Sequence, residues 1–193
     1  MKLILASASP RRAEVLRNAG IAFEAMATGV DEVPQPNESP EELVRRLAEN
    51  KARLAAPRVA GRDGPVIVVG ADTEVVLDGA VLGKPASAED ARGMLRRLSG
   101  RTHSVITGLA AIRLPDGEAR TELETTQVSF APLTPEEVED YVASGEPFDK
   151  AGAYAIQGRG GRFVTRVEGC YFNVVGLPLA RLYRILRDLG WSG

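Results

Sequence analysis

The sequence predicts an α/β fold, a mixed twisted sheet with flanking helices, and three observations favour it. The run VIVV at 66–69 is continuous and β-branched, which is typical of a strand at the centre of a sheet. Segments with helix-capping signals alternate with the strand-like runs. Two long strand patterns, 103–112 and 122–130, flank a Pro-Asp-Gly turn and predict a β-ribbon or meander. No repeat, low-complexity tract or linker divides the chain, so we expect a single domain over 1–193.

The composition is that of an ordinary globular protein, with 44% apolar residues and a formal net charge of −2. This balance lacks the basic excess that favours nucleic acid as a partner. No apolar run approaches the roughly 20 residues that span a bilayer, and the N-terminal run is too short for a signal peptide, so no membrane partner is expected. The single cysteine, Cys170, suits a reducing cytoplasm. With one histidine, His103, a His/Cys zinc site is excluded, and any metal must be bound by carboxylates, as Mg²⁺ or Mn²⁺ is.

The first predicted strand, 3–5, leads into a serine-rich turn and a helix that begins at Pro10. The turn places Ser7 and the pair Arg11 and Arg12 beside free backbone N–H groups, at the positive end of the helix dipole. These groups predict an anion site, in particular for phosphate. On these residues alone, an ordinary strand–helix turn with two solvated arginines remains an open alternative.

A short strand at 23–27 and a polar loop at 28–39 separate this helix from the next one. The loop carries adjacent acids, Asp31 and Glu32. Ser39 and the Pro-Glu-Glu that follows it form a capping box, so a second helix begins there. Its pattern predicts Leu43, Leu47 and Leu54 on the buried face and Lys51 on another face, where a solvated lysine is the usual outcome.

Asp72 follows the predicted central strand directly after Gly70 and Ala71, so we expect it just past the carboxyl end of that strand, where open α/β sheets place ligands. A carboxylate there can bind a metal or accept a proton from water as a general base. An acid that caps its own turn is the alternative. A hairpin over 75–82 then delivers Lys84 in a rigid turn that suits a phosphate ligand, with a solvated lysine as the alternative.

The remaining chain predicts capped helices at 87–100 and 134–145, an amphipathic helix at 178–189 and a last strand at 163–167. Segment 148–161 is dense in glycine. Because glycine is costly in conformational entropy, this density indicates close backbone approach to another group.

Ser7-Ala8-Ser9-Pro10-Arg11-Arg12, Gly70-Ala71-Asp72-Thr73, Gly83-Lys84-Pro85 and the segment from Asp149 to Gly158 stand in this order, before a closing Val174-Val175-Gly176-Leu177-Pro178. Together these motifs resemble the Maf family of nucleoside triphosphate pyrophosphatases over almost the whole chain. The resemblance implies a fold like that of the inosine triphosphate pyrophosphatases, with two lobes around a cleft. It also implies hydrolysis between the α- and β-phosphates to a monophosphate and pyrophosphate, with a divalent metal.

The resemblance also assigns roles by position. Asp72 matches the catalytic acid that accepts the proton of the attacking water, and it is a metal ligand together with Glu32, which has Asp31 beside it. The residues that match phosphate-binding positions are Ser7, Arg12, Lys51 and Lys84.

Three further positions, Arg11, Thr73 and Gln157, match the family branch that acts on dTTP and UTP. The branch that prefers 7-methyl-GTP has Trp, Gln and Glu there. The resemblance therefore implies a dTTP/UTP pyrophosphatase, with modified pyrimidine nucleotides as further candidate substrates, and a homodimer. The alternatives are a 7-methyl-GTP pyrophosphatase and a non-enzymatic nucleotide-binding regulator of cell division.

Overall fold

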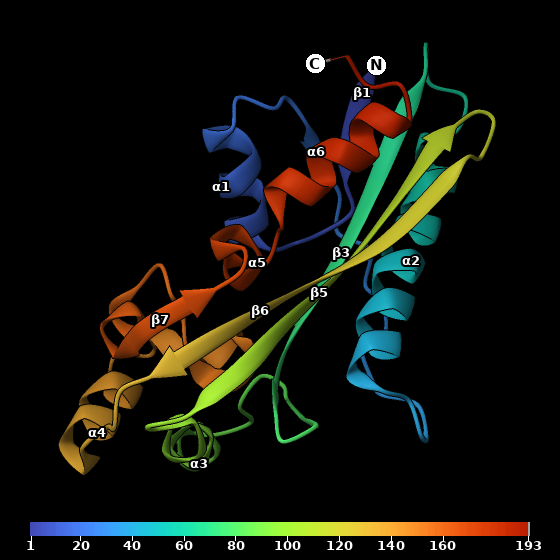
Figure 1. Cartoon of the computed structure of the whole chain (residues 1–193). Coiled ribbons are helices and arrows are strands. Elements are labelled where there is room, and N and C mark those ends of the chain that lie inside the picture. Colours follow the sequence, from blue (N-terminus) through green and yellow to red (C-terminus); the bar gives the residue numbers. More distant parts are fainter. Residues whose placement is uncertain (193) are drawn as a thin grey trace. The chain divides into compact units, whose positions relative to one another are not determined.

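The computed structural model describes residues 1–192 and has a mixed α/β fold (Figure 1). Its strands are β1 (Lys2–Leu5), β2 (Glu24–Ala25), β3 (Val66–Leu77), β4 (Ala80–Leu82), β5 (Thr102–Leu114), β6 (Ala119–Phe130) and β7 (Val164–Glu168). Within the described residues they form a twisted, seven-stranded sheet in the order β2-β1-β3-β5-β6-β7, with β4 paired to β3 beside this path.

The chain divides into two compact units. The described residues of the first unit are 1–72, 107–124 and 176–192, and the second contains 73–106 and 125–175. Strands β3, β5 and β6 therefore each contribute residues to both units.

The first unit contains helices α1 (Pro10–Asn18), α2 (Pro40–Val59) and α6 (Leu179–Asp188). Helix α2 lies on one side of the strands of this unit, and α1 and α6 lie on the other (Figure 1). Strand β1 runs parallel to both β2 and β3, and its last residue, Leu5, pairs with Val69. Helix α1 begins at Pro10 as predicted, and Ser9 caps it by accepting a hydrogen bond from Arg12 N. The predicted capping box at the start of α2 is confirmed, because Ser39 and Glu42 form both of its hydrogen bonds.

Helix α2 packs against its strands through two glycines. A Cβ atom on Gly70 would lie 2.1 Å from the carbonyl oxygen of Ala48, and one on Gly108 would lie 2.2 Å from that of Val44. Both helix residues are on α2, so the helix backbone contacts the strands directly at these points. Any larger side chain at either glycine would force the helix away from the sheet.

The second unit contains α3 (Ala88–Leu98), α4 (Pro135–Ala143) and α5 (Tyr171–Val175), and α3 packs against α4. Strands β3 and β4 form an antiparallel hairpin, in which Asp78 and Gly79 have positive φ angles of 53° and 77°. The aromatic side chains of His103, Phe130 and Tyr154 meet edge to face in the core. The largest buried residues around them are Leu77, Leu95, Leu98, Tyr141 and Phe163.

The predicted helices at 87–100, 134–145 and 178–189 and the long strand pair are confirmed, with ends shifted by a few residues. The two patterns at 66–69 and 75–77 are one continuous strand, β3, so the prediction that Asp72 lies past a strand end is wrong. Gly70 looks like an interruption in the sequence, but it is the point where α2 contacts the strand.

Three smaller expectations also differ. The strand at 23–27 is only Glu24–Ala25, and α5 has no counterpart among the predicted elements. On α2, Leu54 is 50% exposed and Lys51 is buried, so the predicted faces of these two residues are wrong. None of the helices in the described part of the chain is both long and apolar enough to cross a bilayer.

Substituting Gly70 by alanine tests the contact between α2 and β3. We expect Gly70→Ala to lower the free energy of unfolding by about 3 kcal/mol or more, because the added methyl group overlaps the backbone of Ala48. The matched control is Gly93→Ala in α3, where the added Cβ has no atom within 4 Å beyond its chain neighbours and the nearby backbone of its own helix. This change should stabilise the protein by about 0.5–1 kcal/mol through helix propensity. Urea unfolding of both variants checks the opposite signs, and equal effects would contradict the close contact.

His103 gives the second unit a predictable sensitivity to acid. The side chain is 2% exposed, and burial lowers its pKa to about 4. Below pH 6.5 the unfolded chain therefore binds a proton that the folded chain does not, so stability falls as the pH falls toward 4. We expect a loss of about 2 kcal/mol from this group between pH 7 and pH 5. Unfolding of His103→Phe over the same range should show a smaller loss, and identical slopes would refute this assignment.

Candidate active site

The centre of the candidate site is Lys51, which forms ion pairs with two carboxylates. Its Nζ atom lies 2.6 Å from Oδ1 of Asp72 and 2.6 Å from Oε1 of Glu32. The side chains of Lys51 and Asp72 are 9% and 8% exposed, whereas that of Glu32 is 44% exposed. The structure thus brings these three predicted site residues together within the first unit, in a cluster with a formal charge of −1.

The contact between Gly70 and α2 explains why Lys51 meets Asp72. Side chains two residues apart on a strand point to the same face, so Asp72 faces α2 as Gly70 does. Gly70 contacts the helix at Ala48, and Lys51 follows about one turn later on the same helical face. Without a side chain at Gly70, the helix lies close enough for the lysine to reach the carboxylate.

The second oxygen of Asp72 is chemically unusual. Oδ2 is buried and has no hydrogen-bond partner within residues 1–192, while Oδ1 accepts from Lys51. A buried carboxylate oxygen without a donor costs free energy, so such atoms are rare unless they have a function. This atom can accept a proton from water or bind a cation.

The loop before α2 separates the roles of the two adjacent acids. Asp31 accepts a hydrogen bond from the backbone N–H of Val33 and so stabilises its own turn. Glu32 instead contacts Lys51. Arg46 on α2 holds this loop, because its guanidinium donates to the carbonyl of Val33 at 3.1 Å and to the carboxylate of Glu38. The hydrogen bond from Arg46 lowers the pKa of Glu38 to about 2, and together the two contacts of Arg46 fix the segment next to Glu32.

The predicted anion site at the start of α1 is a hydrogen-bonded arrangement around Arg12. Its Nη1 atom donates to Oγ of Ser7 at 3.2 Å, and its Nε atom donates to the carbonyl of Gly176 at 2.8 Å. Arg12 is 9% exposed, so it is not the solvated arginine of the alternative interpretation. Arg11 is half-buried beside it. Ser7 follows the end of β1 by two residues, and Asp72 follows the last β1-paired residue, Val69, by three. Both therefore lie at the same edge of the parallel pair.

The remaining predicted site residues, Thr73, Lys84 and Gln157, belong to the second unit. Thr73 follows Asp72 directly on β3, and both Lys84 and Gln157 are exposed. Gly152 supports the segment of Lys84, because its N–H donates to the carbonyl of Gly83 at 3.1 Å. Gly152 has a φ of +67°, and a Cβ there would lie 2.9 Å from Val75, so only glycine fits this turn without strain.

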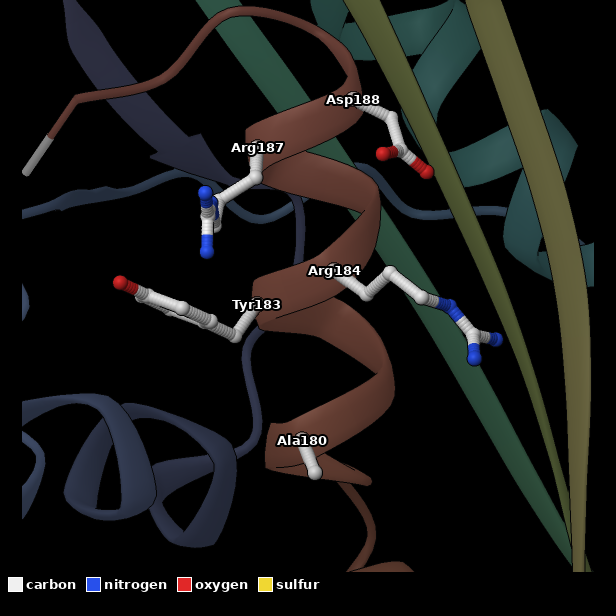
Figure 2. Close-up of a pocket in the computed structure, with 5 residues that line it drawn as sticks. All are labelled: Ala180, Tyr183, Arg184, Arg187 and Asp188. Carbon is white, nitrogen blue, oxygen red and sulfur yellow. The ribbon is translucent and has the colours of Figure 1, made fainter.

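One surface pocket of the first unit is unrelated to these residues. Figure 2 shows that it lies on the outer side of α6 and is lined by Ala180, Tyr183, Arg184, Arg187 and Asp188. All five belong to one helix, and Arg184 already pairs with Glu122. None of the predicted catalytic or binding residues contributes to it, so we place the candidate chemistry at Asp72.

Comparison with known proteins identifies the family. A family model described as Maf-like protein matches residues 2–189. The chain belongs to the Maf-like protein family. The resemblance inferred from the separate motifs is thereby confirmed over nearly the full length of both units.

Curated relatives of this Maf-like chain share about half of its residues. The dTTP/UTP pyrophosphatase of Pelotomaculum thermopropionicum is 48% identical over 191 residues, which cover 99% of this chain and 98% of that protein. The dTTP/UTP pyrophosphatase of Symbiobacterium thermophilum is 51% identical over 190 residues, with coverage of 98% and 95%. A solved HAM1 protein from Coxiella burnetii has 16% identity and a TM-score of 0.50, with coverage of 97% and 99%. This last likeness concerns the fold alone and agrees with the predicted α/β class.

Two supporting residues of the Maf-like site were not found from the sequence. Arg46 looks like one of several charged residues on α2, and only the folded loop reveals its contact with Val33. Gly152 was noticed as part of a glycine-rich segment, but its partner Gly83 is 69 positions away, so no local pattern connects them.

Removing the charge of Lys51 tests the buried cluster. We expect Lys51→Met to lower the free energy of unfolding by about 3 kcal/mol, because Asp72 would be left buried without a counter-ion. Adding Asp72→Asn should recover part of that loss. The control is Arg53→Met on the same helix. Arg53 forms an exposed ion pair with Glu49, and losing this pair should lower the free energy of unfolding by less than about 0.5 kcal/mol. If Lys51→Met and Arg53→Met unfold at the same urea concentration, the ion pair between Lys51 and Asp72 does not contribute the predicted free energy of unfolding.

Proposed function

We propose that this chain is a nucleoside triphosphate pyrophosphatase that hydrolyses dTTP and UTP between the α- and β-phosphates, giving the monophosphate and pyrophosphate. The observation that carries the proposal is the Asp72 carboxylate, which has a lysine on one oxygen and a buried, unpartnered second oxygen. The names of the curated relatives support the substrates. Matches to these proteins extend over almost the whole length of the chain.

In this proposal Asp72 is the catalytic residue, and Oδ2 accepts the proton of the attacking water. Lys51 holds Oδ1 and thereby fixes the direction of Oδ2. Phosphoryl transfer needs positioning and charge neutralisation more than covalent chemistry. Arg12, held by Ser7 and Gly176, and the exposed Lys84 would supply positive charge to the phosphates.

The donor set of the cluster fits a divalent metal ion. No group of three or more His, Cys, Asp and Glu side chains suited to a metal occurs within residues 1–192, so this region offers at most two carboxylates, Glu32 and Asp72. Mg²⁺ and Mn²⁺ accept such sites, because phosphate oxygens and water complete their coordination. The carboxylates of Glu32 and Asp72 would supply oxygen ligands of the kind that such an ion prefers. When bound, the ion would neutralise phosphate charge.

We assign substrate selection to Arg11, Thr73 and Gln157. All three match the dTTP/UTP branch by residue type. The primary amide of Gln157 offers both a donor and an acceptor, as a pyrimidine edge requires. Function in the cytoplasm and assembly as a homodimer belong to the same proposal. The single cysteine supports the first, and the family resemblance supports the second.

Pyrophosphate release from a panel of nucleotides with Mg²⁺ or Mn²⁺ tests the proposal. The panel contains dTTP, UTP, modified pyrimidine triphosphates, GTP and 7-methyl-GTP. We expect dTTP and UTP to be preferred and to yield dTMP and UMP with equimolar pyrophosphate. Preference for 7-methyl-GTP would retain the reaction but reject the assignment of Arg11, Thr73 and Gln157. No turnover of any nucleotide would reject the enzyme and favour a nucleotide-binding regulator.

A further inference from the structure

We propose that Tyr141 and Glu146 are positioning residues for Gln157, and that they set base selectivity by holding the turn that carries it. This inference rests on the proposed function and concerns residues that neither the motifs nor the relatives' names single out. All of the contacts involved lie within the second unit.

Two polar side chains bind the backbone on both sides of this turn. The carboxylate of Glu146 accepts hydrogen bonds from the N–H groups of Arg159 at 2.9 Å and Gly160 at 3.1 Å. It also accepts the hydroxyl proton of Tyr141 at 2.7 Å. The same Tyr141 oxygen accepts from the N–H of Ala155 at 3.1 Å. The pair thus forms a bridge from one side of the turn to the other.

Gln157 lies at the tip of the segment between these anchors. The N–H of Gly158 donates to the carbonyl of Ala155 at 3.3 Å, which closes a four-residue turn with Ile156 and Gln157 at its centre. Ala155 is bound by Tyr141, and Arg159, just after the turn, is bound by Glu146. The Gln157 side chain is exposed and has no hydrogen-bond partner within residues 1–192, so its direction depends on this backbone.

Two glycines of the segment lie in close contact with the side chains of Glu146 and Tyr141. A Cβ on Gly158 would lie 2.4 Å from a carboxylate oxygen of Glu146, and one on Gly160 would lie 2.6 Å from the hydroxyl of Tyr141. The glycine density predicted close approach of the backbone to another group. In the structure, the side chains of Glu146 and Tyr141 are among the groups that this backbone approaches.

The electrostatics suit a rigid anchor. Tyr141 is fully buried, its ring packs edge to face on Phe163 at 5.2 Å, and burial together with Glu146 raises its pKa, so it stays a donor. Burial acts to raise the pKa of Glu146, but hydrogen bonds from Tyr141, Arg159 and Gly160 outweigh it and lower the pKa. Glu146 is therefore ionised, and its hydrogen bonds are of the stronger, charge-assisted kind.

A nearby carboxylate provides a matched control. Asp140 pairs with the side chains of Arg159 and Arg162, and these groups are 43–55% exposed. Asp140 therefore contacts the same segment through flexible, solvated side chains and leaves the backbone unanchored. Exposed pairs of this kind contribute little to local order.

The test compares kcat/KM for UTP and CTP, whose bases differ on the edge that an amide can read. We expect Tyr141→Phe and Glu146→Gln each to reduce the UTP preference about tenfold, as misplacing one good hydrogen bond does. Asp140→Asn should leave the ratio unchanged.

In a double-mutant cycle, adding Tyr141→Phe to Gln157→Ala should reduce the preference no further, because both act through one side chain. Hydrogen exchange at the amides of 155–160 should be faster in Tyr141→Phe and Glu146→Gln than in Asp140→Asn.

The outcomes separate this inference from the proposed function. A wild-type protein that does not prefer dTTP and UTP overturns the proposed function, and the inference with it. A selective wild-type protein whose ratio survives both substitutions overturns the inference alone. Additive effects in the cycle would do the same, because they would show that Tyr141 acts independently of Gln157. Glu146→Gln keeps the test decisive should Tyr141→Phe fail to fold.

Discussion

The direct contact of α2 with β3 at Gly70 is the constraint on which the candidate site depends. Because Gly70 has no side chain, the backbone of the helix rests on the strand, and Lys51 reaches the buried Asp72 one turn further along. A bulkier residue at Gly70 would separate the two charges and leave the Asp72 carboxylate buried without its counter-ion. The position of the carboxylate that we propose as catalytic is therefore set by the packing of Gly70, two residues before it.

The site combines buried charges that do little for folding with supports that keep them in place. The buried ion pair of Lys51 and Asp72 leaves an unpartnered carboxylate oxygen in the interior, an arrangement that hydrophobic residues would stabilise better. Arg46 holds the loop of Glu32, Gly176 holds Arg12, and Gly152 holds the segment of Lys84. In each case a residue outside the reaction fixes one that we assign to it.

Local signals in the sequence were enough for most of the helices: the predicted start at Pro10 and the predicted caps at Ser39 and Thr134 are all present. Local signals failed where the environment of a residue is set by tertiary contacts. Gly70 looked like the end of a strand because its role depends on a helix that begins 30 residues earlier. Lys51 looked solvated because helical periodicity cannot show that the carboxylate of Asp72 lies beside it in the interior. That Glu32 and Asp72 belong to one site was implied only by the family resemblance. Tyr141 and Glu146 had no sequence signal, since they contact each other and the backbone of a segment whose fold no local pattern reveals.

Replacing Asp72 by asparagine is the most direct test of the central claim that this carboxylate performs the chemistry. The substitution keeps the shape of the side chain and leaves Lys51 paired with Glu32, so the free energy of unfolding should change by less than about 1 kcal/mol. Turnover of dTTP should fall by about 1,000-fold or more, because the proton acceptor is lost. A folded Asp72→Asn protein that still releases pyrophosphate at a substantial rate would contradict the account.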